Sequence, residues 1–191
     1  MRALNSRPPS EGWIGAPVPL ALDLGLADQV GIHASHATVY AEGFVLHFEV
    51  TVKRPPTLIC GDAMALARRS GQDPDGLDLH FGVEFADGRR ADWQTTWIRV
   101  NRNSAGSPSL PARDMDPAVS IRVQAIDGRG SDFHYRTRHW VWPVPPPGLL
   151  TLRAGWPAAD LPIRAVDIDA SPLIEARSRS YPLWGLEGNE H

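Results

Sequence analysis

The chain of 191 residues has the length of a single domain, and its net charge of −3 lacks the basic excess of proteins that bind nucleic acid or anionic membranes. The hydrophobic fraction of 42% is that of an ordinary globular protein, and no stretch approaches the roughly 20 apolar residues of a membrane-spanning helix. The 18 prolines and 17 glycines favour many short strands joined by turns over long helices.

Compartment and domain limits are expected from the same features. Cys60 is the only cysteine, so it has no partner for an internal disulfide, and residues 1–15 lack the apolar run of a signal peptide. We therefore expect a cytoplasmic protein. Residues 1–12 are predicted to form a flexible arm, 13–184 a single β domain, and 185–191 a frayed tail.

Alternating apolar and polar residues predict strands in the first part of the chain. Apolar residues recur at every second position from Val18 to Leu24 and, most clearly, from Phe44 to Val52. A turn is predicted at Glu42–Gly43, and residues 61–69 have the composition of a short helix. The strand at 44–53 should bury one face and expose the other.

A second clear strand covers residues 77–85 and leads into a hairpin turn at 86–89, with Asp-Gly at its tip. A return strand is predicted at 93–100. Further along, Asp127–Gly128 is predicted to turn the chain into a long strand over residues 133–142.

The proline-rich run at residues 143–148 lacks most of its backbone donors and cannot sit inside a ladder. Strands are predicted at 150–156 and 163–168, followed by a helix over 172–179 with Ser171 as its capping residue. Seven or eight short strands without βαβ alternation predict an all-β fold, a two-sheet antiparallel sandwich of Ig-like or jelly-roll type.

Motifs for phosphate loops, dinucleotide binding and nucleophile elbows are missing from the sequence. His33 and His36 are three residues apart and would face opposite sides of a regular strand, so they do not predict a metal site. Asp73, Asp75 and Asp78 resemble part of a calcium loop, but no Glu closes it. We expect no metal and no cofactor.

The strand at 133–142 carries the candidate site. If its odd positions face the core, its even positions present two arginines followed by two tryptophans along one surface, a pattern able to anchor a partner. Such residues also stack across a sheet for purely structural reasons. The candidate binding residues on this strand and the 93–100 strand are Arg136, Arg138, Trp140, Trp142, Trp97 and Arg99.

The leading functional hypothesis is a non-catalytic sandwich that binds a protein partner, with no role for nucleic acid or membrane. The alternative is a ligand-binding or hydrolytic sandwich that uses polar outer-face residues around His47, His80 and Glu84. A convergent pocket with titratable groups would favour the alternative.

Two segments carry a resemblance: HWVWPVPPPGLLTLRAGWP at residues 139–157 and GVEFADGRRA at residues 82–91. They resemble a set of uncharacterised proteins from GC-rich bacteria that share a W-P-x-P-P-P-G run and an F-A-D-G-R-R-A hairpin. The resemblance covers about the last 110 residues, from Leu77. It implies a β-rich accessory domain and carries over no catalytic residue.

Overall fold

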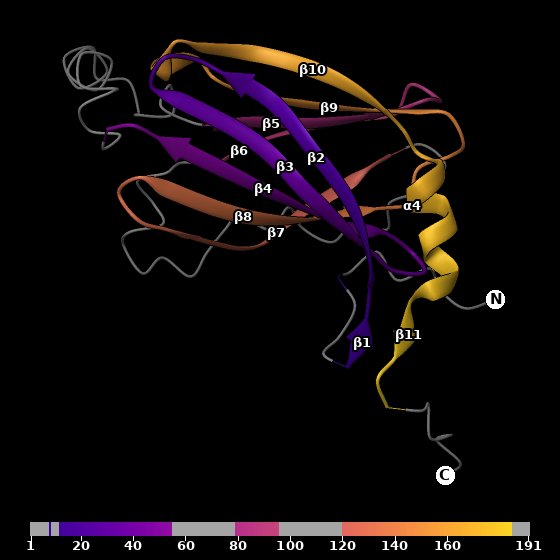
Figure 1. Cartoon of the computed structure of the whole chain (residues 1–191). Coiled ribbons are helices and arrows are strands. Elements are labelled where there is room, and N and C mark those ends of the chain that lie inside the picture. The colour runs from indigo at the N-terminus through magenta and orange to yellow at the C-terminus, as the bar shows by residue number, and fades with distance from the viewer. Residues whose placement is uncertain (1–7, 9–11, 55–78, 96–119, 185–191) are drawn as a thin grey trace.

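The computed structural model describes residue 8 and residues 12–54, 79–95 and 120–184. The predicted all-β sandwich is confirmed: two antiparallel sheets stack face to face (Figure 1). The strands are β1 (Trp13–Ile14), β2 (Ala16–Leu26), β3 (Val30–Val39), β4 (Phe44–Val52), β5 (Leu79–Phe85), β6 (Arg90–Thr95), β7 (Arg122–Gly130), β8 (His134–Trp142), β9 (Leu149–Trp156), β10 (Leu161–Asp169) and β11 (Tyr181–Pro182).

One sheet has five strands in the order β2-β3-β4-β8-β7, and the other has four in the order β10-β9-β5-β6. The sheets enclose one apolar core, because alternate residues of each strand face inward as the period of two predicts. Phe48 of β4 and Phe81 of β5 meet there, with ring centroids 4.6 Å apart. Both strands therefore have the predicted register.

The hairpin between β5 and β6 is confirmed, with Gly88 at φ +85° at its tip, and so is the turn at residues 42–43, where the Tyr40 amide donates to the Gly43 carbonyl. Among the described residues, no helix is long and apolar enough to cross a membrane. The predicted helix at 61–69 and the acidic loop at 73–78 lie outside the described residues.

The predicted turn at Asp127–Gly128 is wrong. Strand β7 continues through both residues, and Asp127 pairs with Arg138 of β8 after a bulge at Ile126. The turn lies at residues 131–133, where the Ser131 amide donates to the His134 carbonyl. Phe133 consequently sits in the turn and is half exposed, although the alternation placed it on the core side.

A helix follows β10 where the sequence predicted one, as α4 (Ser171–Ala176) continued by the 3-10 turn η3 (Arg177–Arg179); a second 3-10 turn, η2 (Pro157–Ala159), precedes β10. The cap differs from the prediction. Ser171 lies within the helix, and both its amide and its hydroxyl donate to the Asp169 carboxylate, at 2.9 and 2.8 Å. Asp169 therefore provides the acceptor for the first backbone amide of the helix.

Candidate functional site

The four candidate binding residues on β8 differ in exposure: two are exposed and two are buried. Arg136 and Arg138 point outward, with side chains 68% and 47% exposed. Trp140 and Trp142 are only 1% and 2% exposed, so the expectation of four exposed residues is wrong for the two tryptophans. They form a second apolar cluster with Val45 on the outer side of the five-stranded sheet. Trp97 and Arg99 lie outside the described residues.

Arg138 is already occupied by a partner on the neighbouring strand. Its Nε donates to Asp127 Oδ1 at 2.7 Å, and its Nη2 contacts Asp127 Oδ2, a bidentate pair. The hydrogen bonds from Arg138 hold the pKa of the Asp127 carboxyl below its usual range, and Asp127 raises the pKa of Arg138 in return. The pair joins β7 to β8 and leaves little of Arg138 for a ligand.

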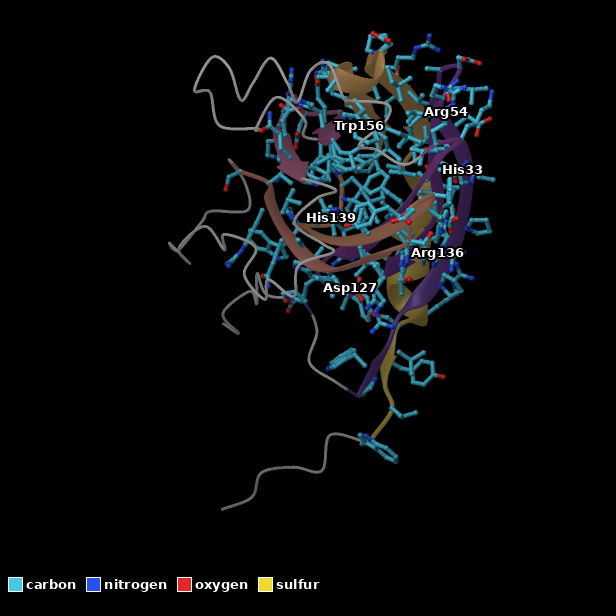
Figure 2. All side chains as sticks on the ribbon, turned by 90° about the vertical axis from the view of Figure 1, so that its left-hand side faces the viewer. His33, Arg54, Asp127, Arg136, His139 and Trp156 are labelled. Carbon is cyan, nitrogen blue, oxygen red and sulfur yellow. The ribbon has the colours of Figure 1, made fainter. Side chains whose placement is uncertain are left out.

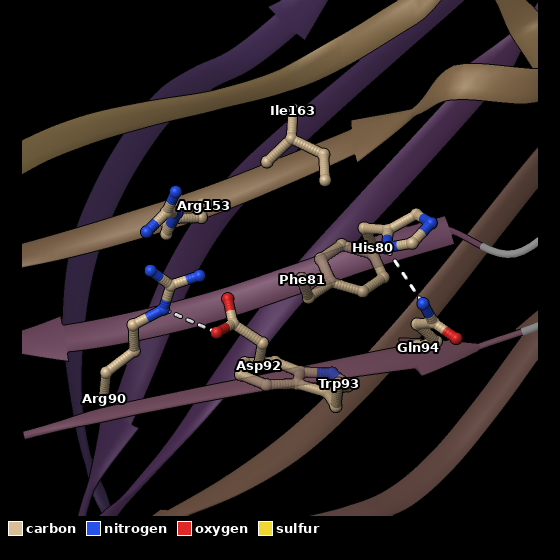
Figure 3. A pocket seen from close by; sticks show the side chains of 8 residues that line it. All are labelled: His80, Phe81, Arg90, Asp92, Trp93, Gln94, Arg153 and Ile163. Carbon is tan, nitrogen blue, oxygen red and sulfur yellow. Dashed lines mark hydrogen bonds and ion pairs between the residues drawn. The ribbon is translucent and has the colours of Figure 1, made fainter.

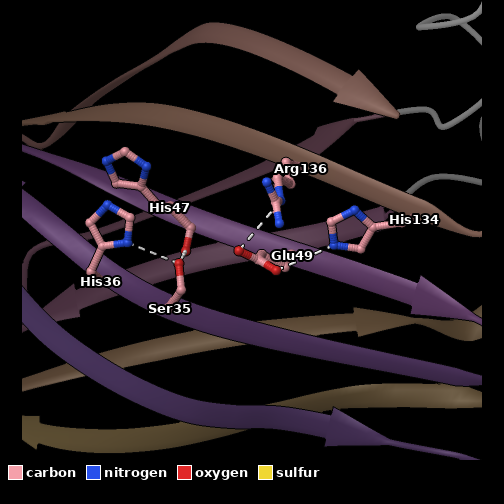
Figure 4. Close-up of polar contacts among 6 residues, drawn as sticks. All are labelled: Ser35, His36, His47, Glu49, His134 and Arg136. Carbon is pink, nitrogen blue, oxygen red and sulfur yellow. Dashed lines mark hydrogen bonds and ion pairs between the residues drawn. The ribbon is translucent and has the colours of Figure 1, made fainter. Parts of the chain in front are cut away.

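Two histidines meet on the same outer face because β3 contains a bulge. The register of β3 on β4 shifts between Ala34 and His36, so His36 lies opposite His47. Their rings stack with centroids 3.8 Å apart (Figure 4). The bulge also corrects the prediction that His33 and His36 face opposite sides, because both now lie on the outer face; His33 Nδ1 is 3.2 Å from Asp23 Oδ1.

The stacked pair is held by two hydroxyl groups of β3. Ser35 Oγ lies 3.0 Å from His36 Nδ1, and Thr38 Oγ1 lies 3.0 Å from His47 Nε2. Burial, followed by the neighbouring His36 and Arg138, lowers the pKa of His47 to about 4. His47 is therefore neutral at physiological pH, and the stack carries no repulsion between two imidazolium rings.

A second polar group on this face centres on Glu49, which forms ion pairs with two side chains of β8. Its carboxylate oxygens lie 3.3 Å from His134 Nε2 and 3.6 Å from Arg136 Nε (Figure 4). Within the described ranges, no three His, Cys, Asp or Glu side chains are grouped as metal ligands. Ser35 and His36 touch, but no carboxylate of the described residues bonds to His36, so the arrangement of a nucleophile, a base and an orienting acid is not assembled there.

The residues of the alternative hypothesis are not brought together. His47 belongs to β4 of the five-stranded sheet, whereas His80 and Glu84 belong to β5 of the four-stranded sheet. Each points outward, so the two sheets and the core separate His47 from the other two. On the outer face of the four-stranded sheet, His80 borders a pocket with Arg90, Asp92 and Arg153 (Figure 3).

One further histidine lies inside the sandwich. His139 is 1% exposed, and its ring lies between the sheets, 5.2 Å from Trp93 and 5.7 Å from Phe81 by centroids (Figure 2). Burial lowers its pKa to about 4. His139 Nδ1 and Trp93 Nε1 are both buried without a hydrogen-bond partner. The odd-face alternation had placed His139 on the core side, and its burial agrees.

Strands β1 and β11 form a separate two-stranded ribbon that extends beyond one end of the sandwich (Figures 1 and 2). Large apolar side chains are exposed along it: Ile14 by 39%, Tyr181 by 55%, Leu183 by 50% and Trp184 by 74%. The Leu183 amide donates to the Gly12 carbonyl at 2.6 Å and continues the pairing. No sequence period pointed to this ribbon, because each strand has only two residues.

Comparisons with protein families, with curated proteins and with solved structures found no match for this chain. The functional argument therefore rests on the geometry of the chain itself. Three places carry it: the paired polar face of the five-stranded sheet, the pocket on the four-stranded sheet, and the apolar ribbon.

Proposed function

We propose that this chain is a non-catalytic binding domain that docks a protein partner through the β1–β11 ribbon. The observation that carries the proposal is that two paired stretches of chain bring together four exposed apolar side chains, Ile14, Tyr181, Leu183 and Trp184. Contiguous apolar surface on a protein marks an interaction site. Aromatic side chains are the most frequent anchors of protein interfaces.

The ribbon is also poorly suited to a purely structural role. A two-stranded ribbon alone is marginally stable in water, and its strands pair with each other and not with either sheet. Contact with a partner would bury the apolar side chains and, by doing so, stabilise the ribbon. The turn η3 leads into β11 and places Arg177 and Arg179 beside it, so the partner surface we propose is an apolar groove bordered by acidic side chains.

The proposal replaces the tryptophans of β8 as anchors with the exposed apolar side chains of the ribbon. It keeps the rest of the sequence-based hypothesis, including a cytoplasmic setting. The paired groups on the five-stranded sheet support this change, since Arg138 is engaged by Asp127 and Glu49 forms ion pairs with His134 and Arg136. The resemblance to β-rich accessory proteins is consistent with an interaction role.

Site-specific photo-crosslinking in cells tests the proposal. A crosslinking side chain at position 184 should capture one defined protein, and position 26 is the matched control, because Leu26 is 73% exposed against 74% for Trp184. Tyr181→Ala with Leu183→Ala should weaken capture from position 184 by about thirtyfold, as for interface anchors. The melting transition should hardly move, since exposed side chains contribute under about 0.5 kcal/mol each.

Equal capture from positions 26 and 184 would refute the ribbon as the docking site. Crosslinks from position 184 to a second copy of the chain would refute a separate protein partner.

A further inference from the structure

The pocket on the outer face of the four-stranded sheet has a volume of about 430 Å³. Its outward-facing lining comes from β5, β6, β9 and the start of β10: His80, Arg90, Asp92, Gln94, Arg153 and Ile163. Figure 3 shows the two arginines at one end and His80 with Gln94 at the other. The volume lies in the range of sites for small molecules.

Two outward-facing glycines lie beside the hollow and allow its walls to approach the sheet. Gly82 lies in the middle of the sheet, paired with Arg153 on one side and Asp92 on the other. A Cβ at Gly82 would overlap the Asp92 carboxylate. A Cβ at Gly155 would overlap the backbone of Ile163, which crosses it where β10 bulges. The missing side chains therefore let the Asp92 carboxylate and the backbone of Ile163, both parts of the pocket wall, lie close against the sheet.

The charged groups of the pocket are unevenly satisfied. Arg90 Nε donates to Asp92 Oδ2 at 2.5 Å, so that carboxylate is engaged by its own strand. Arg153 Nη1 lies 3.7 Å from Glu84 Oε2, beyond hydrogen-bonding range. Arg153 Nε is buried and has no hydrogen-bond partner.

A buried guanidinium N–H without an acceptor is unfavourable, because it has lost its water and gained nothing in exchange. Two arginines and Asp92 line the pocket, and the Glu84 carboxylate lies beside them, 3.7 Å from Arg153. Neither carboxylate bonds to Arg153 Nε, so what the pocket lacks is an acceptor for that N–H. Arginine forks match the oxygens of carboxylate and phosphate groups.

We propose that this pocket binds a small polar molecule through a carboxylate or phosphate group held by Arg153 and Arg90. The Asp92 carboxylate orients the Arg90 guanidinium, and the remaining volume lies toward His80, whose Nδ1 is 3.2 Å from Gln94 Nε2. These two groups would contact the rest of the ligand. The site lies on the sandwich and not on the ribbon, so it is independent of partner docking.

Nuclear magnetic resonance of the arginine Nε–H groups, with the full chain, tests the site. Sodium phosphate and sodium citrate are the two probes, and sodium chloride at equal ionic strength is the control. We expect a saturable shift of the Arg153 resonance with a dissociation constant of about 1 mM or lower for at least one probe. Saturation by phosphate identifies a phosphate-bearing ligand, and saturation by citrate alone identifies a carboxylate.

Four variants separate a built site from general attraction. Arg153→Gln and Arg90→Gln should each weaken binding at least about tenfold. Arg153→Lys should also weaken it, because lysine keeps the charge and loses the fork. Arg164→Gln is the matched control, since Arg164 is exposed on the same sheet and does not line the pocket. The Arg90 variant covers the case in which Arg153→Gln does not fold.

Shifts that chloride reproduces, that fail to saturate, or that Arg164→Gln weakens as much as Arg153→Gln would overturn the proposal. Full binding by Arg153→Lys would overturn the fork as the means of recognition.

Discussion

His139 makes the stability of the sandwich depend on pH in a way that can be calculated from its surroundings. Its Nε2 lies 2.8 Å from Thr137 Oγ1, and the Thr137 hydroxyl donates to the Asp127 carbonyl at 3.2 Å. A hydroxyl has one hydrogen, so the imidazole must be the donor to Thr137 and carry its proton on Nε2. The Nδ1 lone pair then faces the core without a donor.

Protonating Nδ1 would place a charge between the sheets, and burial accordingly lowers the pKa of His139 to about 4, a shift that Asp127 opposes only in part. In the unfolded chain the ordinary value is about 6.5. The folded state stays neutral while the unfolded state takes up a proton, so the free energy of unfolding is unaffected above about pH 7 and falls as the pH drops from about 6.5 to about 4. The loss amounts to about 3 kcal/mol.

Urea unfolding of wild type and His139→Leu at pH 7.5 and pH 4 measures this loss. Between the two pH values, the free energy of unfolding of the variant should fall by about 3 kcal/mol less than that of wild type. At pH 7.5 it should lie within about 1.5 kcal/mol of wild type, because Thr137 keeps its bond to Asp127. Phe48→Leu is the control: its ring lies 5.9 Å from His139 and has no titratable group, so it should lose equal stability at both pH values. Parallel pH profiles for wild type and His139→Leu would refute the reasoning.

Three further substitutions test the packing by urea unfolding. Phe81→Ala should cost about 3–5 kcal/mol, because Phe81 is 2% exposed between the sheets; a loss under about 1 kcal/mol would contradict the assigned register of β5. Trp142→Ala should cost a similar 3–5 kcal/mol, since Trp142 is also 2% exposed. A loss near zero would show that Trp142 is not buried. Arg138→Ala should cost under about 1 kcal/mol, because its pair with Asp127 is partly open to solvent; a larger loss would mean that the pair holds β7 in place.

The strands with strict alternation could be predicted from sequence because each burial decision is local. In β4 and β5 the apolar residues recur at every second position, and Phe48 and Phe81 are buried as expected. Bulges cannot be predicted in this way, because a residue is extra only relative to the strand with which it pairs. The bulge at Ser35 put His36 beside His47, and the one before Asp127 kept β7 extended through a predicted turn.

The candidate site was predicted less well than the fold, for a related reason. Alternation correctly placed Trp140 and Trp142 on the outer side of β8, but it does not say whether other side chains cover that side; Val45 and Tyr40 pack on them. The pocket depends on Arg153 of β9 lying across Gly82 of β5 from Asp92 of β6, and β9 is distant in sequence from the β5–β6 hairpin. No local pattern contains that information.

The polar side chains on the two outer faces of the sandwich differ in how many of them have partners within the chain. This difference indicates which face is suited to bind a ligand. On the five-stranded sheet, Asp127 pairs with Arg138, and the Glu49 carboxylate lies 3.3 Å from His134 Nε2, so these groups gain little from a ligand. On the four-stranded sheet, Arg153 keeps a buried donor without an acceptor beside a hollow. An acceptor bound in the hollow would remove that cost. The charged residues in the sequence suggested a site on the five-stranded sheet, whereas the unsatisfied hydrogen-bond donor favours one on the four-stranded sheet.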